Sequence, residues 1–517
     1  MKEGWKLLDV ATLDFEDKKT WDMISSGHTD AVFQLESAGM KDVCKRIQPH
    51  DMEALCAILA LYRPDSMGDL EHYINRKNGT EKIEYVHPDL IPILENTYGC
   101  CIYQEQTMKI SRVFAGFSFA ESDDLRKGLG KKDKSIVKAQ AQKFYKRALE
   151  NGYPEKVCKQ LMEEMENKGG YSFNRSHSYS YAVTAYKTAY LQANYDVFFL
   201  CALLNSNKGS YSDLSKYINL CKQKDVSVEE PDINNSHDDF SIANGKILFG
   251  LAMIKNVGDA NVEEFAKCRP FTSFEDFLEK CTPDTRTVAS LIKAGCFNNL
   301  FKDKIKLLNI YCKHLYSPNQ YKEASSLPTK KKMFELKLIQ DEIDFKNKEL
   351  CLLRYNNYRK NKYDENEATR YEKHSSEFKE KYLKGSLEDF EMETLSMYLT
   401  TNPYGDLKDI LIPLDEMDFG DVVIAGTIIE IQKKTDRNSK KYAYVSLVNH
   451  EGIIVEAVAW SSIYSRYQDV LKKGIKIIAK CKKKDNGISL DDIETLGEWK
   501  EKIKAREQIT NIKKGLL

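Results

Sequence analysis

The chain has 517 residues, of which 42% are hydrophobic and 30% are charged, and its 78 Lys and Arg are balanced by 78 Asp and Glu. A chain of this length and composition can bury about three globular cores, which excludes a low-complexity or fibrous protein. Because the formal net charge is zero, any attraction to nucleic acid must come from local basic faces.

The cysteines and the N-terminus indicate a cellular compartment. None of the thirteen cysteines belongs to a Cys-x-x-Cys pair, so reduced thiols are expected rather than a zinc site or a disulfide framework. The first ten residues lack the apolar core of a signal peptide, and the longest apolar run, near residues 54–62, is far too short to span a bilayer. We therefore expect a soluble, intracellular chain with no membrane partner.

The first two hundred residues carry apolar side chains at helical spacing, for example at residues 52–62, 107–114 and 182–204, and predict a mainly helical region. The segment Glu-Pro-Asp-Ile-Asn at residues 230–234 breaks this pattern, and a strand-like stretch follows at residues 246–251. A domain boundary is therefore expected near residue 225.

The last two hundred residues change character twice. Residues 329–384 are dominated by Lys, Glu and Asn, which predicts long solvated helices or a partly disordered connector. After Pro413 the pattern changes to short alternating strands with one helical piece before the last. These strands are expected at residues 422–431, 442–447, 453–460 and 475–481. Three strands, a helix and a further strand suit a small OB barrel.

Two motifs open the helical region. Residues 30–37 read Asp-Ala-Val-Phe-Gln-Leu-Glu-Ser, followed by Gly-Met-Lys at 39–41. Residues 60–64 read Ala-Leu-Tyr-Arg-Pro. Arg63 could pair with a nearby acid, or it could face a template or nucleotide phosphate, for which a planar multidentate donor is suited.

A third motif, Tyr-Gln-Glu-Gln, occupies residues 103–106. The ring of Tyr103 could stack on a base or a sugar, and Glu105 could fix neighbouring basic side chains. The alternative is that the motif is simply a capped helix start.

A fourth motif, residues 122–132, is rich in cations. It holds Arg126, Lys127, Lys131 and Lys132 within seven residues. Such a group on a helix and its exit loop could grip a polyphosphate, although a solvated helix face is the alternative. Ser122 or Asp123 is expected to serve as a helix N-cap.

A fifth motif, Phe-Asn-Arg-Ser-His, occupies residues 173–177. Arg175 and His177 are expected to face DNA or a nucleotide phosphate. The alternative is an ordinary satisfied histidine.

In this order and at similar spacing, the five motifs resemble the fingers domain of the family C DNA polymerases, the alpha subunits of bacterial DNA polymerase III. The chain departs from the family at Asp65 and Ser66, where Gly-Pro is usual, at Lys127, which replaces an Arg, and at Arg175, which replaces a Lys. The resemblance implies nucleotide binding by Tyr103, Glu105, Arg126, Lys127, Lys131, Lys132, Arg175, His177 and, secondarily, Arg63.

Two glycine-bearing turns, at residues 254–258 and 291–295, resemble the tandem helix-hairpin-helix that follows the fingers in this family. Such turns bind duplex phosphates through backbone amides, and an ordinary helix connection is the alternative. Asn256 stands where the first hairpin usually has a glycine, and Asn tolerates left-handed geometry. The resemblance implies DNA binding by Lys255, Asn256, Gly258, Lys293 and Gly295.

Residues 393–403 resemble the stretch that precedes the OB domain of the family. The first hairpin loop of that domain combines cations with aromatic rings, a mixture suited to single-stranded DNA. Its expected contacts are Lys433, Lys434, Arg437, Lys440, Tyr442 and Tyr444. A barrel used for protein contact or support is the alternative.

The expected fold is therefore multidomain, with mainly α-helical fingers and helix-hairpin-helix regions followed by a small β-barrel (OB-fold). The expected parts are fingers at 1–225, a tandem helix-hairpin-helix region at 226–328, a charged helical connector at 329–412, an OB domain at 413–500 and a tail at 501–517.

DNA synthesis needs metal ions held by clustered aspartates, yet the sequence contains no Asp-x-Asp pair. In the family these aspartates lie in a palm upstream of the region that this chain resembles. We therefore expect a split polymerase, in which a palm-containing chain binds Mg²⁺ and this chain, inactive alone, binds primer-template DNA and deoxynucleoside triphosphates. The initial Met favours the start of a separate gene over release by protein splicing.

The alternative is a non-catalytic DNA-binding polymerase remnant, favoured by the substitutions at Asp65, Ser66 and Asn256. A scaffold without DNA affinity is a third possibility. A sliding clamp remains a possible partner, although no clear clamp motif appears and residues 340–345 have the wrong spacing. By the resemblance, the location is the cytoplasm of a bacterial cell or of a phage-infected bacterium.

Overall fold

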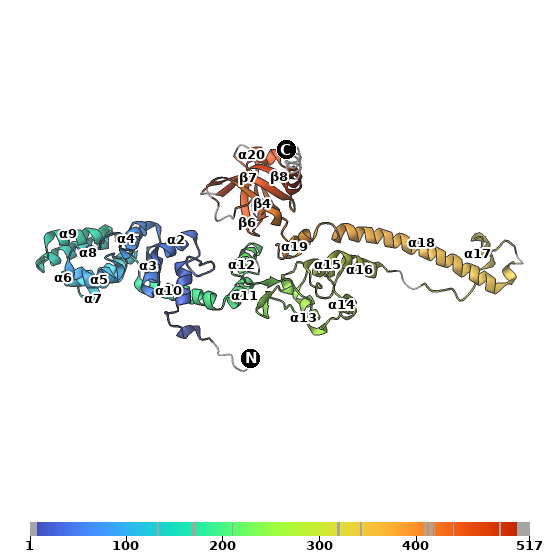
Figure 1. Cartoon of the computed structure of the whole chain (residues 1–517), viewed down its shortest axis with the longest axis horizontal. Coiled ribbons are helices and arrows are strands. Elements are labelled where there is room, and N and C mark those ends of the chain that lie inside the picture. The colour runs from blue at the N-terminus through green and yellow to red at the C-terminus, as the bar shows by residue number, and fades with distance from the viewer. Residues whose placement is uncertain are drawn as a thin grey trace, which may run out of the picture. The chain divides into compact units, whose positions relative to one another are not determined.

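Helices fill the first two hundred residues, as their apolar spacing predicts. The computed structural model describes residues 8–131, 134–167, 172–208, 210–317, 321–341, 344–407, 411–412, 417, 419–437, 439–484 and 487–503. The chain forms two units, Met1–Phe199 and Leu200–Leu517 (Figure 1). None of the described helices is long and apolar enough to cross a membrane.

The helices of the first unit have the following bounds: α1 Lys18–Ser25, α2 Ala38–Ile47, α3 Met52–Leu61, α4 Met67–Lys77, α5 Ile91–Leu94, α6 Gln104–Ala115, α7 Phe119–Lys131, α8 Lys134–Glu150, α9 Glu155–Asn167, α10 Arg175–Asn194 and the start of α11 Asp196–Ser206. Many begin at a side-chain cap; for example, Asp17, Ser37 and Asp51 accept backbone N–H groups of α1, α2 and α3.

The helices of the first unit enclose two hydrophobic cores. The first core packs α1 to α4 against α10, with Trp21, Leu55 and Tyr186 buried at its centre. The second packs α5 to α9 around Phe114 and Phe144. Helix α10 therefore carries one face into the first core and leaves another to solvent.

Two local expectations for this unit need correction. Helix α7 begins at Phe119, so Ser122 and Asp123 lie inside it; the N-terminal N–H groups are instead satisfied by Ser118 and Glu121, which bond each other reciprocally. The apolar run at 182–204 is not one helix, because α10 ends before Tyr195 and α11 follows it.

The second unit begins with helices and a small sheet. Its elements are the remainder of α11, α12 Tyr211–Gln223, β1 Val228–Glu229, β2 Ser241–Ala243, β3 Lys246–Leu248, the 3-10 turn η5 Leu251–Met253, α13 Asp259–Cys268, α14 Phe274–Lys280, α15 Thr285–Ala294 and α16 Lys304–Tyr316. Strand β3 pairs with β1 in parallel and with β2 antiparallel. The turn after η5 and the end of α15 hold the two glycine-bearing turns.

The charged connector is largely helical. It contains α17 Lys330–Glu335, α18 Lys348–Tyr382 and α19 Leu387–Leu395. Helix α18 is 35 residues long, which confirms the long solvated helix expected here (Figure 1). At its start, Cys351 packs with Met333 and Ile339 in a small core. The segment 340–345 includes residues 342 and 343, which lie outside the described residues.

The C-terminal strands close into a barrel. They are β4 Gly420–Thr435, β5 Lys441–Asn449, β6 Ile454–Ala459, β7 Lys476–Lys484 and β8 Gly487–Thr495, with α20 Ser461–Arg466 between β6 and β7. The strand order β4-β5-β6-β8-β7 returns to β4, and β6 and β8 pair in parallel. The barrel and its helix confirm the expected OB-like fold. The tail after residue 503 lies outside the described residues.

Candidate nucleotide and nucleic-acid interface

The third and fifth sequence motifs lie side by side. Tyr103 and Phe173 form an isolated parallel bridge, in which Gln104 N donates to Phe173 O at 2.9 Å and Phe173 N donates to Ile102 O at 3.0 Å. The side chain of Gln104 also donates to the carbonyl of Ser172 at 3.2 Å. The Tyr-Gln-Glu-Gln motif therefore positions the start of α10.

Glu105 completes this junction. Its carboxylate accepts hydrogen bonds from Asn174 Nδ2 and Arg175 N, both at 3.0 Å. A carboxylate is favourable at a helix N-terminus because it meets unpaired N–H groups and the positive end of the helix dipole. Glu105 therefore fixes the start of α10, and its contact with a nucleotide stays a prediction.

Tyr103 does not face solvent. Its side chain is only 2% exposed, and burial raises the pKa of its phenol. The hydroxyl has no hydrogen-bond partner within the described part of the chain. The expectation that this ring stacks on a base is therefore corrected, because neighbouring core side chains already cover it. The capped helix start is confirmed, since Gln106 Oε1 accepts Tyr103 N at 2.9 Å.

The cations of the fourth motif are paired with acids in their own helix. Arg126 Nε lies 2.8 Å from Asp123 Oδ1, and Lys127 Nζ lies 3.0 Å from Asp123 Oδ2 and 3.4 Å from Asp124 Oδ1. These contacts hold the pKa of Asp123 below its usual range. The side chains of Lys131 and Lys132 lie outside the described residues. Arg126 and Lys127 are thus adjacent and partly exposed, but they are not free of counter-charge.

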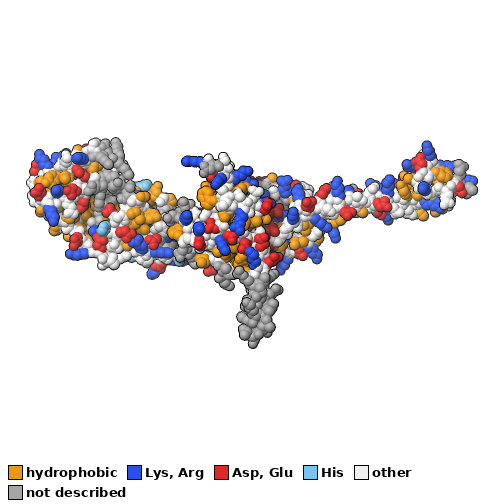
Figure 2. Space-filling view, turned by 90° about the horizontal axis from the view of Figure 1, so that it is seen from above, with side chains coloured by type: hydrophobic (Ala, Val, Ile, Leu, Met, Phe, Trp, Pro, Cys, Tyr) orange, Lys and Arg blue, Asp and Glu red, His pale blue; other side chains and the backbone are white. Residues whose placement is uncertain are grey.

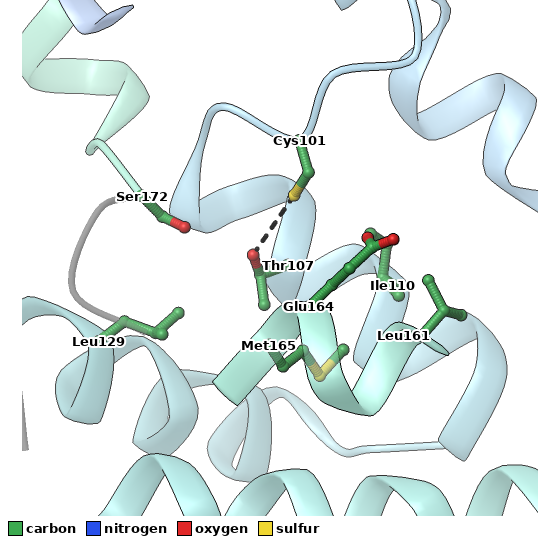
Figure 3. Close-up of a pocket in the computed structure, with 8 residues that line it drawn as sticks. All are labelled: Cys101, Thr107, Ile110, Leu129, Leu161, Glu164, Met165 and Ser172. Carbon is green, nitrogen blue, oxygen red and sulfur yellow. Dashed lines mark hydrogen bonds between the residues drawn. The ribbon is translucent and has the colours of Figure 1, made fainter. Parts of the chain in front are cut away.

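A small cavity connects this helix to the start of α10. It has a volume of about 20 Å³ and is shown in Figure 3. Leu129, two residues after Lys127, and Ser172, three residues before Arg175, both line it. Cys101 and Thr107 contact each other across it at 3.6 Å. Residues of α7, of the segment before α10 and of the first turn of α6 therefore border one cavity.

Arg175, His177 and Arg63 surround this junction. Arg175 Nη2 pairs with Glu53 Oε1 at 2.5 Å, and its side chain is 46% exposed. The ring of His177 is exposed on the first turn of α10. Arg63 donates to the carbonyl of Ala60 at 2.8 Å and places its guanidinium 4.5 Å from the ring centre of Phe173. The structure thus brings Arg175, His177 and Arg63 to one neighbourhood.

The first glycine-bearing turn has the geometry that the sequence required. Asn256 adopts a left-handed φ of 68°, and its amide donates to Ser290 Oγ at 3.0 Å. Gly258 is the N-cap of α13, and Lys255 and Asn256 are exposed. The acidic Asp259 occupies the first helical position, where it opposes phosphate binding.

The second turn is buried. Lys293 is 1% exposed and forms an ion pair with Glu393 at 2.7 Å. Gly295 is left-handed at φ 93°, and an added Cβ would lie 2.8 Å from Glu230 Oε1 and 3.1 Å from Lys304 Nζ. Neither Lys293 nor Gly295 can meet DNA in this arrangement, because Glu393 of α19 covers the first, and Glu230, directly after β1, and Lys304 of α16 cover the second. The expectation of DNA contact is corrected for both.

On the face seen in Figure 2, basic and acidic side chains intermingle over the described residues. A nucleic-acid surface must therefore be recognised by a local combination of cations and aromatic rings. The β4–β5 hairpin has this combination. Lys433, Lys434, Arg437 and Lys440 are exposed there. The ammonium of Lys434 lies 4.7 Å from the ring centre of Tyr444.

Trp460 was missed by the sequence reasoning. It is 54% exposed and stacks on Tyr442, with ring centroids 5.6 Å apart and planes at 28°. Tyr442 in turn meets Tyr444 edge to face at 5.9 Å. The sequence did offer a signal for Trp460. It directly follows a strand, and a residue at that position shares a face with Tyr442. The three rings form an aromatic surface suited to unpaired bases.

A groove of about 450 Å³ lies beside the hairpin. Its lining combines several lysines with the short helix α20 and the loop after it: Lys433, Lys434, Thr435, Lys441, Tyr464, Gln468, Asp469, Leu471 and Lys472. Four ammonium groups beside one carboxylate favour an anion such as a sugar-phosphate backbone.

The sequence predicts that Mg²⁺ is bound only in an assembled polymerase. Across the described ranges, no three His, Cys, Asp or Glu side chains gather as they would around a metal ion. Mg²⁺ binding by a partner chain stays a prediction.

Two family models match the chain. The bacterial DNA polymerase III alpha subunit finger domain matches residues 2–152, and the helix-hairpin-helix motif matches residues 225–307. The DNA polymerase III subunit alpha of Aquifex aeolicus (strain VF5) is 32% identical over 509 residues, covering 94% of this chain and 39% of the relative. That of Chlamydia muridarum is 32% identical over 495 residues, covering 92% and 37%.

A third relative, the DNA polymerase III subunit alpha of Staphylococcus epidermidis (strain ATCC 35984), is 36% identical over 308 residues, covering 58% of this chain and 29% of the relative. The chain thus spans about two fifths or less of the length of these curated relatives.

Proposed function

The chain belongs to the family of bacterial DNA polymerase III alpha subunits, and we propose that it works in DNA replication as part of a DNA-directed DNA polymerase. In this proposal it binds the incoming deoxynucleoside triphosphate and the primer-template DNA. The catalytic palm aspartates and their Mg²⁺ are on another polypeptide, and this chain is inactive alone.

One observation carries the nucleotide-binding part of the proposal. The bridge between Tyr103 and Phe173 places Arg175 and His177 beside the start of α6, and one cavity is lined both by Leu129 of α7 and by Ser172, which precedes α10. Arg126 and Lys127 lie on the last two turns of α7. Cations from two separate helices around one junction can grip a triphosphate by charge and hydrogen bonding, without any covalent step.

The DNA-binding part rests on two surfaces of the second unit. The first glycine-bearing turn presents the exposed Lys255 for a duplex phosphate, next to Gly258, whose N–H donates to Asn261 Oδ1 at 3.3 Å. The hairpin of the barrel presents Lys434, Tyr442 and Trp460 for an unpaired strand.

Primer extension tests the split-polymerase proposal. This chain is mixed with a palm-containing polypeptide, obtained from the neighbouring reading frames, on a primed template with all four deoxynucleoside triphosphates. Extension is expected only from the mixture, and it should be lost when Arg126 and Lys127 are both replaced by Ala. No extension by a mixture whose two chains copurify would contradict the proposal.

A non-catalytic DNA-binding remnant is the second candidate. It is favoured by the pairing of Arg126 and Lys127 with Asp123, which lowers their attraction for phosphate. The two candidates differ in triphosphate binding. The remnant predicts primer-template binding that weakens with salt and no affinity for deoxynucleoside triphosphates.

A further inference from the structure

A continuous run of four rings and one guanidinium group joins three distant segments of the first unit. The ring centroid of Phe33 lies 5.3 Å from that of Tyr181, and Tyr181 lies 4.3 Å from His177. His177 lies 5.5 Å from Phe173, and the guanidinium of Arg63 lies 4.5 Å from the centre of the Phe173 ring. We call these five side chains the ring ladder. The first, second and fifth sequence motifs thus meet in one feature.

The outer end of the ring ladder is exposed. Phe33 is 38% and Tyr181 is 37% accessible, whereas Val32 and Leu35, which flank Phe33 closely, are 1% and 0% accessible. A phenylalanine that served only the core would be buried with them. Two adjacent exposed rings form an apolar surface that a flat ligand could cover.

The backbone around Phe33 is strained. Ala31 and Gln34 both adopt left-handed conformations, with φ of 58° and 64°, which side chains with a Cβ rarely do. Two hydrogen bonds hold the loop: Gln192 Nε2 donates to Asp30 O at 2.7 Å, and Thr29 Oγ1 donates to Leu35 O at 2.6 Å. Such strain persists where the surrounding structure enforces it, commonly at ligand contacts. Here it turns Phe33 outward.

The inner end of the ring ladder is cationic. Arg63 lies over Phe173, and Arg175 begins the same helix that carries His177 and Tyr181. Exposed rings at one end and guanidinium groups at the other match a nucleotide, whose base is flat and apolar and whose phosphates are anionic.

We propose that Phe33 and Tyr181 stack on an unpaired nucleobase whose phosphate lies toward Arg63 and Arg175. The proposal rests on the proposed function and extends it, because it assigns the base contact to two residues that the nucleotide-binding motifs did not include. The base belongs either to a free deoxynucleoside triphosphate or to a nucleotide of single-stranded DNA.

Quenching of 2-aminopurine fluorescence tests the stacking. The full chain is titrated into the 2-aminopurine deoxynucleoside triphosphate and, in a second arm, into an oligonucleotide that carries one 2-aminopurine. Phe33→Ala and Tyr181→Ala should each weaken binding of one probe about tenfold and reduce its quenching. The probe that responds identifies the source of the base. Tyr181→Phe, which keeps the ring, should bind like the wild type.

Tyr179→Ala is the matched control, because Tyr179 is 42% exposed on the same helix but is not part of the ring ladder. It should leave both titrations unchanged, and circular dichroism melts should show that all variants are folded. If Arg126→Ala weakens triphosphate binding while Phe33→Ala and Tyr181→Ala change neither probe, the stacking proposal is overturned and the proposed function stands. If the wild type binds neither probe, both are overturned.

Discussion

Asp123 holds two cations at once, with Arg126 Nε at 2.8 Å from one carboxylate oxygen and Lys127 Nζ at 3.0 Å from the other. The three side chains are between 35% and 53% exposed, so each pair contributes little to stability and can exchange for another anion. In the proposed function, a phosphate of the nucleotide would replace Asp123 as the partner of these two cations.

Replacing Asp123 by Asn should strengthen triphosphate binding about threefold to tenfold, because it removes a negative charge beside the two cations. Fluorescence anisotropy with a labelled deoxynucleoside triphosphate measures the change. Asp22→Asn, which breaks a comparable exposed pair between Lys18 and Asp22 in α1, should leave affinity unchanged. Equal affinity of wild type and Asp123→Asn would argue against a phosphate site at α7.

Lys293 should matter for stability and not for DNA. Its ammonium is buried, pairs with Glu393 and lies 5.0 Å from the ring centre of Phe390. Lys293→Ala should lower the free energy of unfolding by about 2 kcal/mol, because it leaves a cavity, whereas Lys293→Met fills the space and should cost less than about 1 kcal/mol, since the half-exposed Glu393 can be solvated. Urea unfolding measures both.

Binding of duplex DNA should distinguish the role of Lys255 from that of Lys293. Lys255→Ala should weaken binding and reduce its salt dependence, and Lys293→Met should leave both unchanged. A loss of DNA affinity in folded Lys293→Met would show that the second turn reopens to meet DNA.

Trp460 should contribute to single-stranded DNA binding by stacking. Trp460→Ala should weaken binding of an unstructured oligonucleotide about tenfold with little change in its salt dependence, because a ring releases no counterions. Lys434→Ala should instead reduce the salt dependence. Phe419→Ala serves as the control, since Phe419 is 68% exposed but lies by Lys483, away from the Tyr442 stack. A normal affinity of Trp460→Ala would favour a supporting role for the barrel.

Glu121 should make the first unit sensitive to acid. It accepts hydrogen bonds from Lys143, the backbone of Ser118 and Arg147, which lower its pKa from 4.5 to about 2. Because the folded pKa lies below the unfolded one, its contribution is present above about pH 4.5 and is lost as the pH falls toward 2. Glu121→Gln should flatten the fall in melting temperature across this window. An unchanged profile would indicate that other carboxylates dominate.

Local sequence was sufficient where the signal itself is local. The alternating strands after Pro413 predict the barrel, and the charged stretch predicts α18, because strand and helix patterns repeat every few residues. The left-handed conformation of Asn256 also follows from residue type, because a positive φ costs Asn less conformational energy than it costs most residues. Ion-pair partners cannot be predicted from local sequence. Nothing in the sequence distinguishes Lys293 from a surface lysine, because its partner Glu393 is 100 residues away.

The sequence by itself determined the family resemblance, the order of helices and strands, and the residue types available for phosphate and base contact. Only the tertiary structure decided which of them face solvent. Tyr103 and Lys293 are buried, Glu105 caps α10, and Phe33 and Trp460 are exposed beside rings from distant segments. The reason is physical: backbone preference acts over a few residues, whereas exposure and counter-charge depend on contacts between segments far apart in the chain.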